Sequence, residues 1–177
     1  MNFCGRRFNL YLLLTAALTF VCGCAMLKRE HKQTAALRIH IQSVASVPGA
    51  SQTISVMRSQ PVLLNIANEP FLTEADVASA QLLEVPDGFA VEIKFDKAGG
   101  WALEQYSAVN LGKHLAIFGQ WGDKPADGRW LAAPIIVHRM AGATLVFTPD
   151  ASRAEMEQFV KGLNADAREN ADAKAKQ

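Results

Sequence analysis

All three cysteines of this 177-residue chain lie within its first 24 residues, at Cys4, Cys22 and Cys24. The rest of the sequence has no thiol to pair, so no disulfide can hold its fold together. It must therefore fold on a hydrophobic core of its own, and half of the chain's residues are hydrophobic. A chain of this length suits one domain that buries roughly two-thirds of its unfolded surface.

The first residues have the layout of a secretory signal peptide. Arg6 and Arg7 supply positive charge, residues 8–21 are almost wholly apolar, and small residues follow. The apolar run is shorter than the ~20 residues that a membrane-spanning helix needs. We therefore predict that residues 1–23 are a cleaved signal peptide rather than a permanent membrane span.

The end of this segment, Val21-Cys22-Gly23-Cys24, resembles the lipobox of bacterial lipoproteins. The resemblance implies cleavage after Gly23 and acylation of Cys24, and two or more acyl chains anchor a protein stably to a membrane. It also implies a place in the cell envelope facing the periplasm, and Ala25 favours the outer membrane if the host has two membranes. The alternative is a plain export signal with an incidental cysteine.

The charge of the chain is nearly balanced. It has 18 basic and 17 acidic residues, for a net charge of +1, and loss of Arg6 and Arg7 would leave −1. This balance does not indicate a nucleic-acid partner or a polybasic membrane surface. We predict that residues 24–36 form a polar stem between the lipid and the domain.

Alternating apolar residues predict several strands after the stem. Leu37, Ile39 and Ile41 alternate with polar residues and predict the first strand. The clearest hairpin joins residues 81–85 to residues 89–95 through a turn in which Gly88 supplies a positive φ. The remaining predicted strands are residues 54–56, 62–66, 114–121, 129–137 and 143–147.

Two main helices are predicted. The first is capped by Asp96 and ends before Gly112, and its apolar stripe consists of Ala98, Ala102, Tyr106 and Val109. Gly99 and Gly100 weaken its first turn by about 1 kcal/mol each relative to Ala, which suggests a close approach to a neighbouring strand. A shorter helix of one or two turns is predicted from Thr73.

The last helix has two competing starts. Thr148 could cap it with Pro149 in the first position, or Ser152 could cap it with Glu155 completing a capping box. Its apolar stripe consists of Met156, Phe159, Val160 and Leu163. Residues 164–177 have no apolar side chain larger than alanine, so we predict a disordered or frayed tail.

These elements predict one α+β domain over residues 37–163. Hairpins dominate the strand order, so we expect a mostly antiparallel sheet with the two main helices packed on one face.

The order of these elements resembles the head of the first periplasmic domain of SecD, a membrane protein that assists protein export. The resemblance covers residues 71–163 and depends on the order and spacing of short marks rather than on any single one. The marks are Asp76-Val77 with Ala80, Asn110 with Gly112-Lys113, Ala116-Ile117, Ala133-Pro134-Ile135-Ile136 and residues 142–148.

The chain departs from SecD in ways that limit what the resemblance implies. SecD carries this head among several transmembrane helices and above a periplasmic base, neither of which the sequence predicts here. A longer loop, residues 122–128, also replaces the usual Asp-Gly turn. The resemblance therefore implies a fold and an envelope setting, and it does not imply translocase activity.

The sequence shows no catalytic or metal-binding motif. The four histidines are His31, His40, His114 and His138, and none has the spacing of a metal-ligand pair. No phosphate-binding loop and no G-x-S-x-G stretch is present. We expect no catalytic site, no metal and no cofactor.

The aromatic residues allow two interpretations. Trp101, Trp121, Trp130, Phe118 and Tyr106 either fill the core or form an exposed platform for a partner, and core filling is the more common use. Arg129 and Trp130 stand beside the polar loop, and we take them as the candidate partner surface.

Three functional hypotheses remain open. The first is a non-enzymatic, lipid-anchored envelope module that binds an envelope or export protein or an exported chain. The second is a small envelope hydrolase that uses His114 or His138 with a nearby acid. The third is a purely structural envelope lipoprotein.

Overall fold

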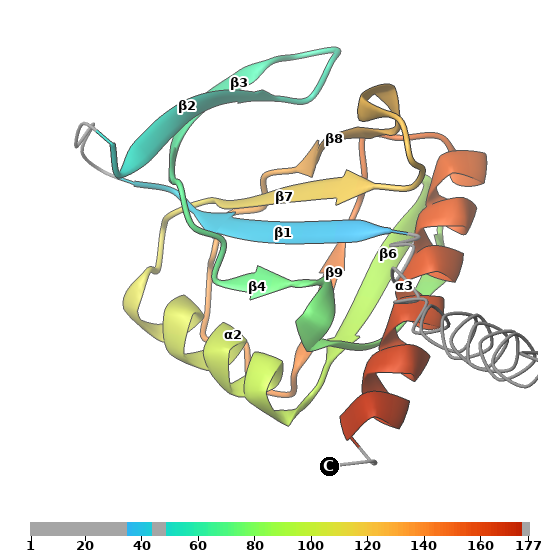
Figure 1. Ribbon diagram of the computed structural model, residues 1–177. Coiled ribbons are helices and arrows are strands. Elements are labelled where there is room, and N and C mark those ends of the chain that lie inside the picture. Colours follow the sequence, from blue (N-terminus) through green and yellow to red (C-terminus); the bar gives the residue numbers. More distant parts are fainter. Residues whose placement is uncertain (1–34, 44–48, 175–177) are drawn as a thin grey trace, which may run out of the picture. The chain divides into compact units, whose positions relative to one another are not determined.

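The computed structural model describes residues 35–43 and 49–174, apart from the side chain of Pro125. The predicted signal peptide, the lipidation site Cys24 and the stem up to residue 34 lie outside the described residues. Within them the fold is α+β and every strand pair is antiparallel, as predicted (Figure 1). The described strands are divided among three sheets rather than joined in one.

The four-stranded sheet is the centre of the fold. Alternation in the first strand places Leu37 and Ile39 on one face, and Ile39 lies opposite Ile117 in the next strand. In order across the sheet, the strands are β4 (Leu72–Thr73), β1 (Ala36–Ile41), β7 (Leu115–Gln120) and β8 (Gly128–Ala132).

The three-stranded sheet contains the predicted hairpin. Gly88 has φ +137°, as the tight turn requires, and Val91 and Ile93 of its second arm are fully buried. The strands, in order, are β5 (Val77–Val85), β6 (Gly88–Phe95) and β9 (Thr144–Phe147). This sheet and the four-stranded sheet share one large hydrophobic core.

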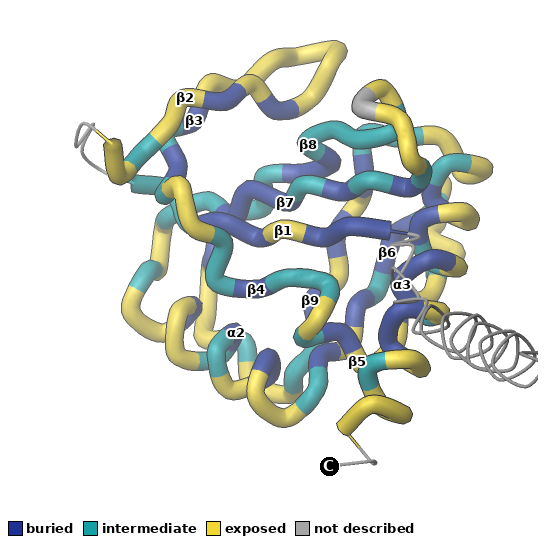
Figure 2. The backbone as a smooth tube through the Cα atoms, in the orientation of Figure 1, coloured by how far each residue is buried: buried dark blue, intermediate teal, exposed yellow. Residues whose placement is uncertain are grey.

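The third sheet is a two-stranded ribbon, β2 (Ser51–Val56) and β3 (Val62–Ala67), here called the arm. The arm covers the other face of the four-stranded sheet, where Ile54, Val56, Leu64 and Ile66 pack on Ala116 of β7. This packing buries His40, which the alternation had placed on a polar face. Figure 2 shows buried and exposed residues along the arm, with its connecting loop exposed.

The first main helix, α2 (Lys97–Val109), is capped as predicted, because the Asp96 side chain accepts a hydrogen bond from the Gly99 amide. Its predicted apolar stripe is wrong, since the buried face consists of Gly99, Gly100, Leu103 and Ser107. A Cβ at Gly100 would lie 2.4 Å from the Cβ of Ala143. The two glycines therefore let Asp76 and Ala143 approach the helix closely, as the sequence suggested.

The last helix, α3 (Arg153–Lys174), begins at the second of the two predicted starts. The Ser152 hydroxyl accepts a hydrogen bond from the Glu155 amide, while the Glu155 carboxylate accepts one from the Ser152 amide, which completes a capping box. Met156, Phe159 and Leu163 are fully buried.

The predicted disordered tail is wrong for residues 164–174, which continue α3. Asn164 bonds both the amide and the carbonyl of Ala80 on β5, and the buried Asp166 accepts a bond from the Ala35 amide. Lys174 pairs with Asp96 at 2.8 Å. Polar side chains thus hold this part of the helix against the domain, and a search for large apolar residues could not find them.

The domain boundaries differ slightly from the prediction. Ala35 and Ala36, assigned to the stem, are buried, so they belong to the domain. The predicted short helix is one turn, η1 (Glu74–Asp76), capped by Thr73. A second turn, η2 (Pro125–Asp127), lies in the polar loop before β8.

Candidate partner-binding surface

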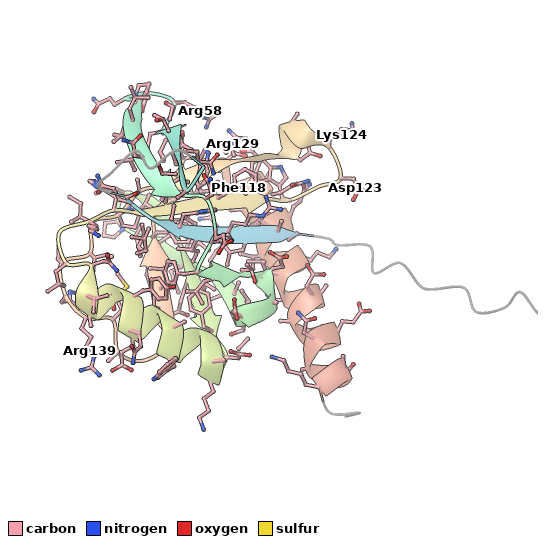
Figure 3. The ribbon with its side chains drawn as sticks, turned by 60° about the vertical axis from the view of Figure 1, so that its left-hand side comes forward. Arg58, Phe118, Asp123, Lys124, Arg129 and Arg139 are labelled. Carbon is pink, nitrogen blue, oxygen red and sulfur yellow. The ribbon has the colours of Figure 1, made fainter. Side chains whose placement is uncertain are left out.

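A groove of about 720 Å³ opens between the arm and the four-stranded sheet, at its β8 edge. It contains both residues of the predicted partner surface, Arg129 and Trp130. Figure 3 shows Arg58, Arg129 and Phe118 gathered at this end of the molecule. The lining residues are Ser55, Met57, Arg58, Pro61, Phe118, Ala126, Gly128, Arg129, Trp130 and Asp150.

Two aromatic rings on neighbouring strands form one wall of the groove. Phe118 of β7 pairs in register with Trp130 of β8, and their rings meet edge to face with centroids 5.5 Å apart. Trp130 meets the ring of His40 in the same way, also at 5.5 Å. Because Trp130 also packs against the small core beneath the arm, its position depends on the arm being closed.

An ion pair holds the tip of the arm. The guanidinium of Arg58 lies 3.1 Å from the Asp150 carboxylate, which also accepts a hydrogen bond of 2.7 Å from the Arg58 amide. The Asp150 amide in turn donates to the carbonyl of Leu131 on β8. The side-chain hydrogen bond from Arg58 lowers the pKa of Asp150 below its ordinary value.

Arg129 is engaged on the side of the larger core. Its guanidinium pairs with Glu155 and lies 4.8 Å from the ring centroid of Trp121. Burial raises the pKa of Glu155, but hydrogen bonds from Ser152 and the charge of Arg129 outweigh it, so the pKa falls below its ordinary value. Arg129 therefore ties the groove to the start of α3.

The structure brings Arg129 and Trp130 to one groove but gives each an intramolecular role as well. Their part in binding a partner stays a prediction. The sequence did not identify Met57, Arg58 or Pro61 as members of this surface, since they lie about 70 residues away from Trp130 in the chain. The only signal was Pro61 just before the predicted strand 62–66, and it does not indicate which sheet the ribbon covers.

The aromatic residues do not form one cluster. Trp121 is buried and Trp130 is half-buried, both near the groove, whereas Trp101 is 65% exposed on α2. Tyr106 stacks on Phe71 with ring centroids 4.4 Å apart. The platform and core-filling interpretations therefore each describe part of the set.

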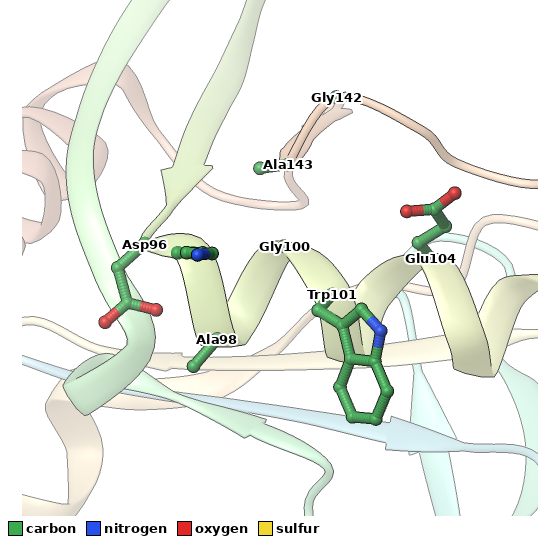
Figure 4. A pocket seen from close by; sticks show the side chains of 8 residues that line it. Asp96, Ala98, Gly100, Trp101, Glu104, Gly142 and Ala143 are labelled. Carbon is green, nitrogen blue, oxygen red and sulfur yellow. The ribbon is translucent and has the colours of Figure 1, made fainter.

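A second hollow, of about 840 Å³, lies over the first half of α2 (Figure 4). Trp101, Gly100 and Ala143 line it together with Glu104. One side of this hollow is formed by Gly142 and Ala143, in the loop that packs against Gly100.

The two histidines of the hydrolase hypothesis do not form a catalytic arrangement. The ring of His114 bonds the side-chain oxygen of Gln42 at 3.0 Å, and His138 is exposed. Among residues 35–43 and 49–174, no three His, Cys, Asp or Glu side chains are placed to hold a metal ion. His31 lies outside the described residues.

Comparison with known proteins finds a likeness in structure alone. No family model matches the sequence, and no curated protein does either. A crystal structure of SecDF in its super-membrane-facing form matches with a TM-score of 0.54 and 23% identity, over 75% of this chain and 19% of that one. A structure of SecDF, a membrane component that enhances protein export, matches with a TM-score of 0.53 and 23% identity, over 75% of this chain and 63% of that one.

The chain thus spans less than two-thirds of either SecDF chain. In the described part of the sequence, no helix is both long and apolar enough to cross a membrane. At this level of identity the likeness shows the fold, and the SecD-like architecture predicted from the order of the elements is confirmed.

Proposed function

We propose that this protein is a lipid-anchored, non-enzymatic envelope module that binds an extended segment of an envelope protein or an exported chain in the groove beneath its arm. Acylation of Cys24, after removal of residues 1–23, would hold the domain to a membrane facing the periplasm. The lipobox-like sequence supports the anchor, and the SecDF-like fold supports a link to protein export.

The groove itself is the observation that carries the binding proposal. It has aromatic rings on one side, Met57 and Pro61 on the other, and guanidinium groups at its rim. Aromatic and arginine side chains are the residues that most often dominate protein–protein contacts. A lining of this kind suits apolar side chains of a polypeptide together with its backbone carbonyls.

Filling the groove tests the proposal. Ala126 is exposed on the groove wall, so Ala126→Trp should occupy the groove without disturbing the core. We expect the affinity of the purified full chain for an unfolded, fluorescently labelled test polypeptide to fall about tenfold, as measured by anisotropy. Ala165→Trp, at an exposed position on α3, is the matched control and should leave the affinity unchanged.

Three results would contradict parts of the proposal. If the full chain does not bind the polypeptide, or if both tryptophan variants bind like wild type, the groove is not a polypeptide site and the structural lipoprotein becomes the better hypothesis. The anchor has a separate test, since mass analysis of the mature amino terminus should show lipid on Cys24. An unmodified Cys24 would reject the anchor and leave the groove proposal standing.

A further inference from the structure

Four large aliphatic side chains project from one end of the domain, away from the groove. They come from the end of α2 and from the segment that follows β8, and all are more than half exposed. They are Val109 at 78%, Leu111 at 58%, Ile135 at 51% and Val137 at 74%, and we call them the aliphatic tip.

Backbone hydrogen bonds join the two segments of the tip. The Gly112 amide donates to the Ile136 carbonyl at 2.8 Å, and the Ile136 amide donates to the Lys113 carbonyl at 2.9 Å. The side chain of Ile136 is fully buried, so its neighbours Ile135 and Val137 point the opposite way, as alternation in extended chain requires. The exposure of the tip is therefore built into the fold.

Several backbone amides around the tip have acceptors within the domain. Lys113 donates to the Asn110 carbonyl and Leu115 donates to the Pro134 carbonyl, while the Asn110 side chain donates to the Tyr106 carbonyl. A surface that enters lipid must satisfy its backbone groups internally, because hydrocarbon offers no hydrogen bonds. The amides of Gly112, Lys113, Leu115 and Ile136 meet that condition, and the tip presents aliphatic side chains outward.

Two basic residues stand on the segments that form the tip. Lys113 lies between Leu111 and Leu115, and Arg139, two residues after Val137, pairs with Glu104 of α2. His138 is exposed on the same segment. A basic rim complements anionic lipid headgroups, and two copies of the tip would bring like charges together, which disfavours self-association.

The tip also lies within reach of a bilayer. Ala36 and Ile41 mark the two ends of β1, and Ile41 pairs with Leu115 beside the tip, so the tip lies roughly 20 Å from the start of the domain. The stretch from Cys24 to Ala35 can extend to at most ~40 Å. Figure 3 shows Arg139 at the opposite end of the domain from Arg58, so contact at the tip leaves the groove open.

We propose that the aliphatic tip inserts its side chains into the headgroup region of an anionic bilayer. Trp101, exposed on the same outer side of α2 and sharing a hollow with Val109 and Arg139, suits the interfacial depth at which tryptophan accumulates. The proposal rests on the proposed membrane anchoring, and it orients the domain with its groove facing away from the lipid.

The test places an environment-sensitive fluorescent amino acid at position 137 of the full chain reconstituted in vesicles of three parts phosphatidylcholine to one part phosphatidylglycerol. Lipids that carry a nitroxide near the headgroup should quench this probe at least twofold more than the same probe at Asp87, an exposed hairpin turn. Leu111→Glu should remove about nine-tenths of the extra quenching, because a charge replaces an exposed aliphatic side chain that would enter the lipid. Leu63→Glu, at an exposed leucine on the arm, is the matched control and should remove none.

Equal quenching at positions 137 and 87 would overturn the proposal. So would a photocrosslinker at position 137 that joined two copies of the chain or captured another protein, since the tip would then be a protein interface. Polypeptide binding by the Leu111→Glu variant keeps the two proposals apart. If that variant binds the test polypeptide normally but the wild-type probe is not quenched, only the tip proposal fails. If the wild-type probe is quenched but the chain does not bind the polypeptide, only the groove proposal fails.

Discussion

The two faces of the four-stranded sheet are covered in very different ways. On one face, β1, β7 and β8 pack against the three-stranded sheet and both long helices. The core between them has 21 buried residues, counted over residues 35–43 and 49–174. On the other face, the arm alone provides the cover, and the cluster beneath it has five buried residues in the same described ranges. One sheet thus supports a large core and a small one.

From this difference we expect the free energy of local opening to differ between the two faces of the sheet. Segments from most of the chain meet in the larger core, so opening it requires nearly global unfolding. The small core needs only the arm to lift, and regions with few buried apolar contacts open at low free energy. We therefore expect the arm that covers the groove to open at a lower free energy than the larger core, and the following changes test that contrast from the largest effect to the smallest.

Phe159→Ala should cause the largest loss of stability. Phe159 is fully buried on α3, and its ring lies against Gly119 of β7, so truncation leaves a cavity in the larger core. We expect the free energy of unfolding to fall by about 3–5 kcal/mol. Denaturant titration measures it, and Val160→Ala, at a half-buried neighbour, should cost much less. A loss below 1 kcal/mol would place the main stability elsewhere.

Ile66→Ala should act mainly on the arm. Ile66 is fully buried in the small core, so its truncation should lower the free energy of arm opening by about 2–4 kcal/mol. Hydrogen exchange should then speed up for amides of β2 and β3 while those of β6 stay protected. Leu63→Ala, at an exposed position on the same strand, is the control. Equal acceleration in β6 would show that the two cores unfold as one cooperative unit.

The sequence predicted local elements in both cores, and it failed where a feature depends on residues far apart in the chain. The β5–β6 hairpin and the Ser152 capping box depend on residues close together in the chain, and their local chemistry was enough. The buried face of α2 was not predictable from periodicity, because it is lined by glycines that admit Asp76 and Ala143.

The long-range pairings were also out of reach. Asn164 gave no hydrophobic signal, yet it bonds the backbone of Ala80 on β5. The strands of the arm were predicted, but nothing in their pattern indicated that they would cover His40. Trp130 was identified as a candidate site residue because it stands beside the polar loop. Arg58 was not, because only the long-range packing of the arm brings it to the groove.

Acidification should weaken the arm selectively. Burial lowers the pKa of His40 below its ordinary value of 6.5, and the nearby charge of Arg38 lowers it further, although the hydrogen bond to the Ala67 carbonyl opposes both. As pH falls through about 6.5, the open state binds a proton before the closed state does, so the closed arm loses stability. Exchange of β2 and β3 amides should therefore accelerate at pH 5.5 relative to pH 7.5, after correction for intrinsic rates. His40→Gln should abolish that difference, and a difference that persists in this variant would assign it to another group.

The smallest effect should come from Arg58→Ala. Its guanidinium is exposed, and exposed ion pairs contribute little to global stability, so the denaturant midpoint should not change measurably. The local consequences should still be visible, since the pKa of Asp150 should rise toward its ordinary value when the hydrogen bond from Arg58 is lost. A carboxyl titration followed by NMR measures that rise, and hydrogen exchange near the loop between β2 and β3 should accelerate slightly.

Arg153→Ala is the control. It removes a similarly exposed ion pair, with Glu84, and should leave the pKa of Asp150 unchanged. Because salt screens exposed charges, the wild-type and Arg58→Ala arms should exchange more alike at 1 M salt than at 0.05 M. If Arg58→Ala instead lowered the global midpoint as much as Ile66→Ala, the tip would be part of the cooperative fold, and the contrast between the two faces of the sheet would be lost.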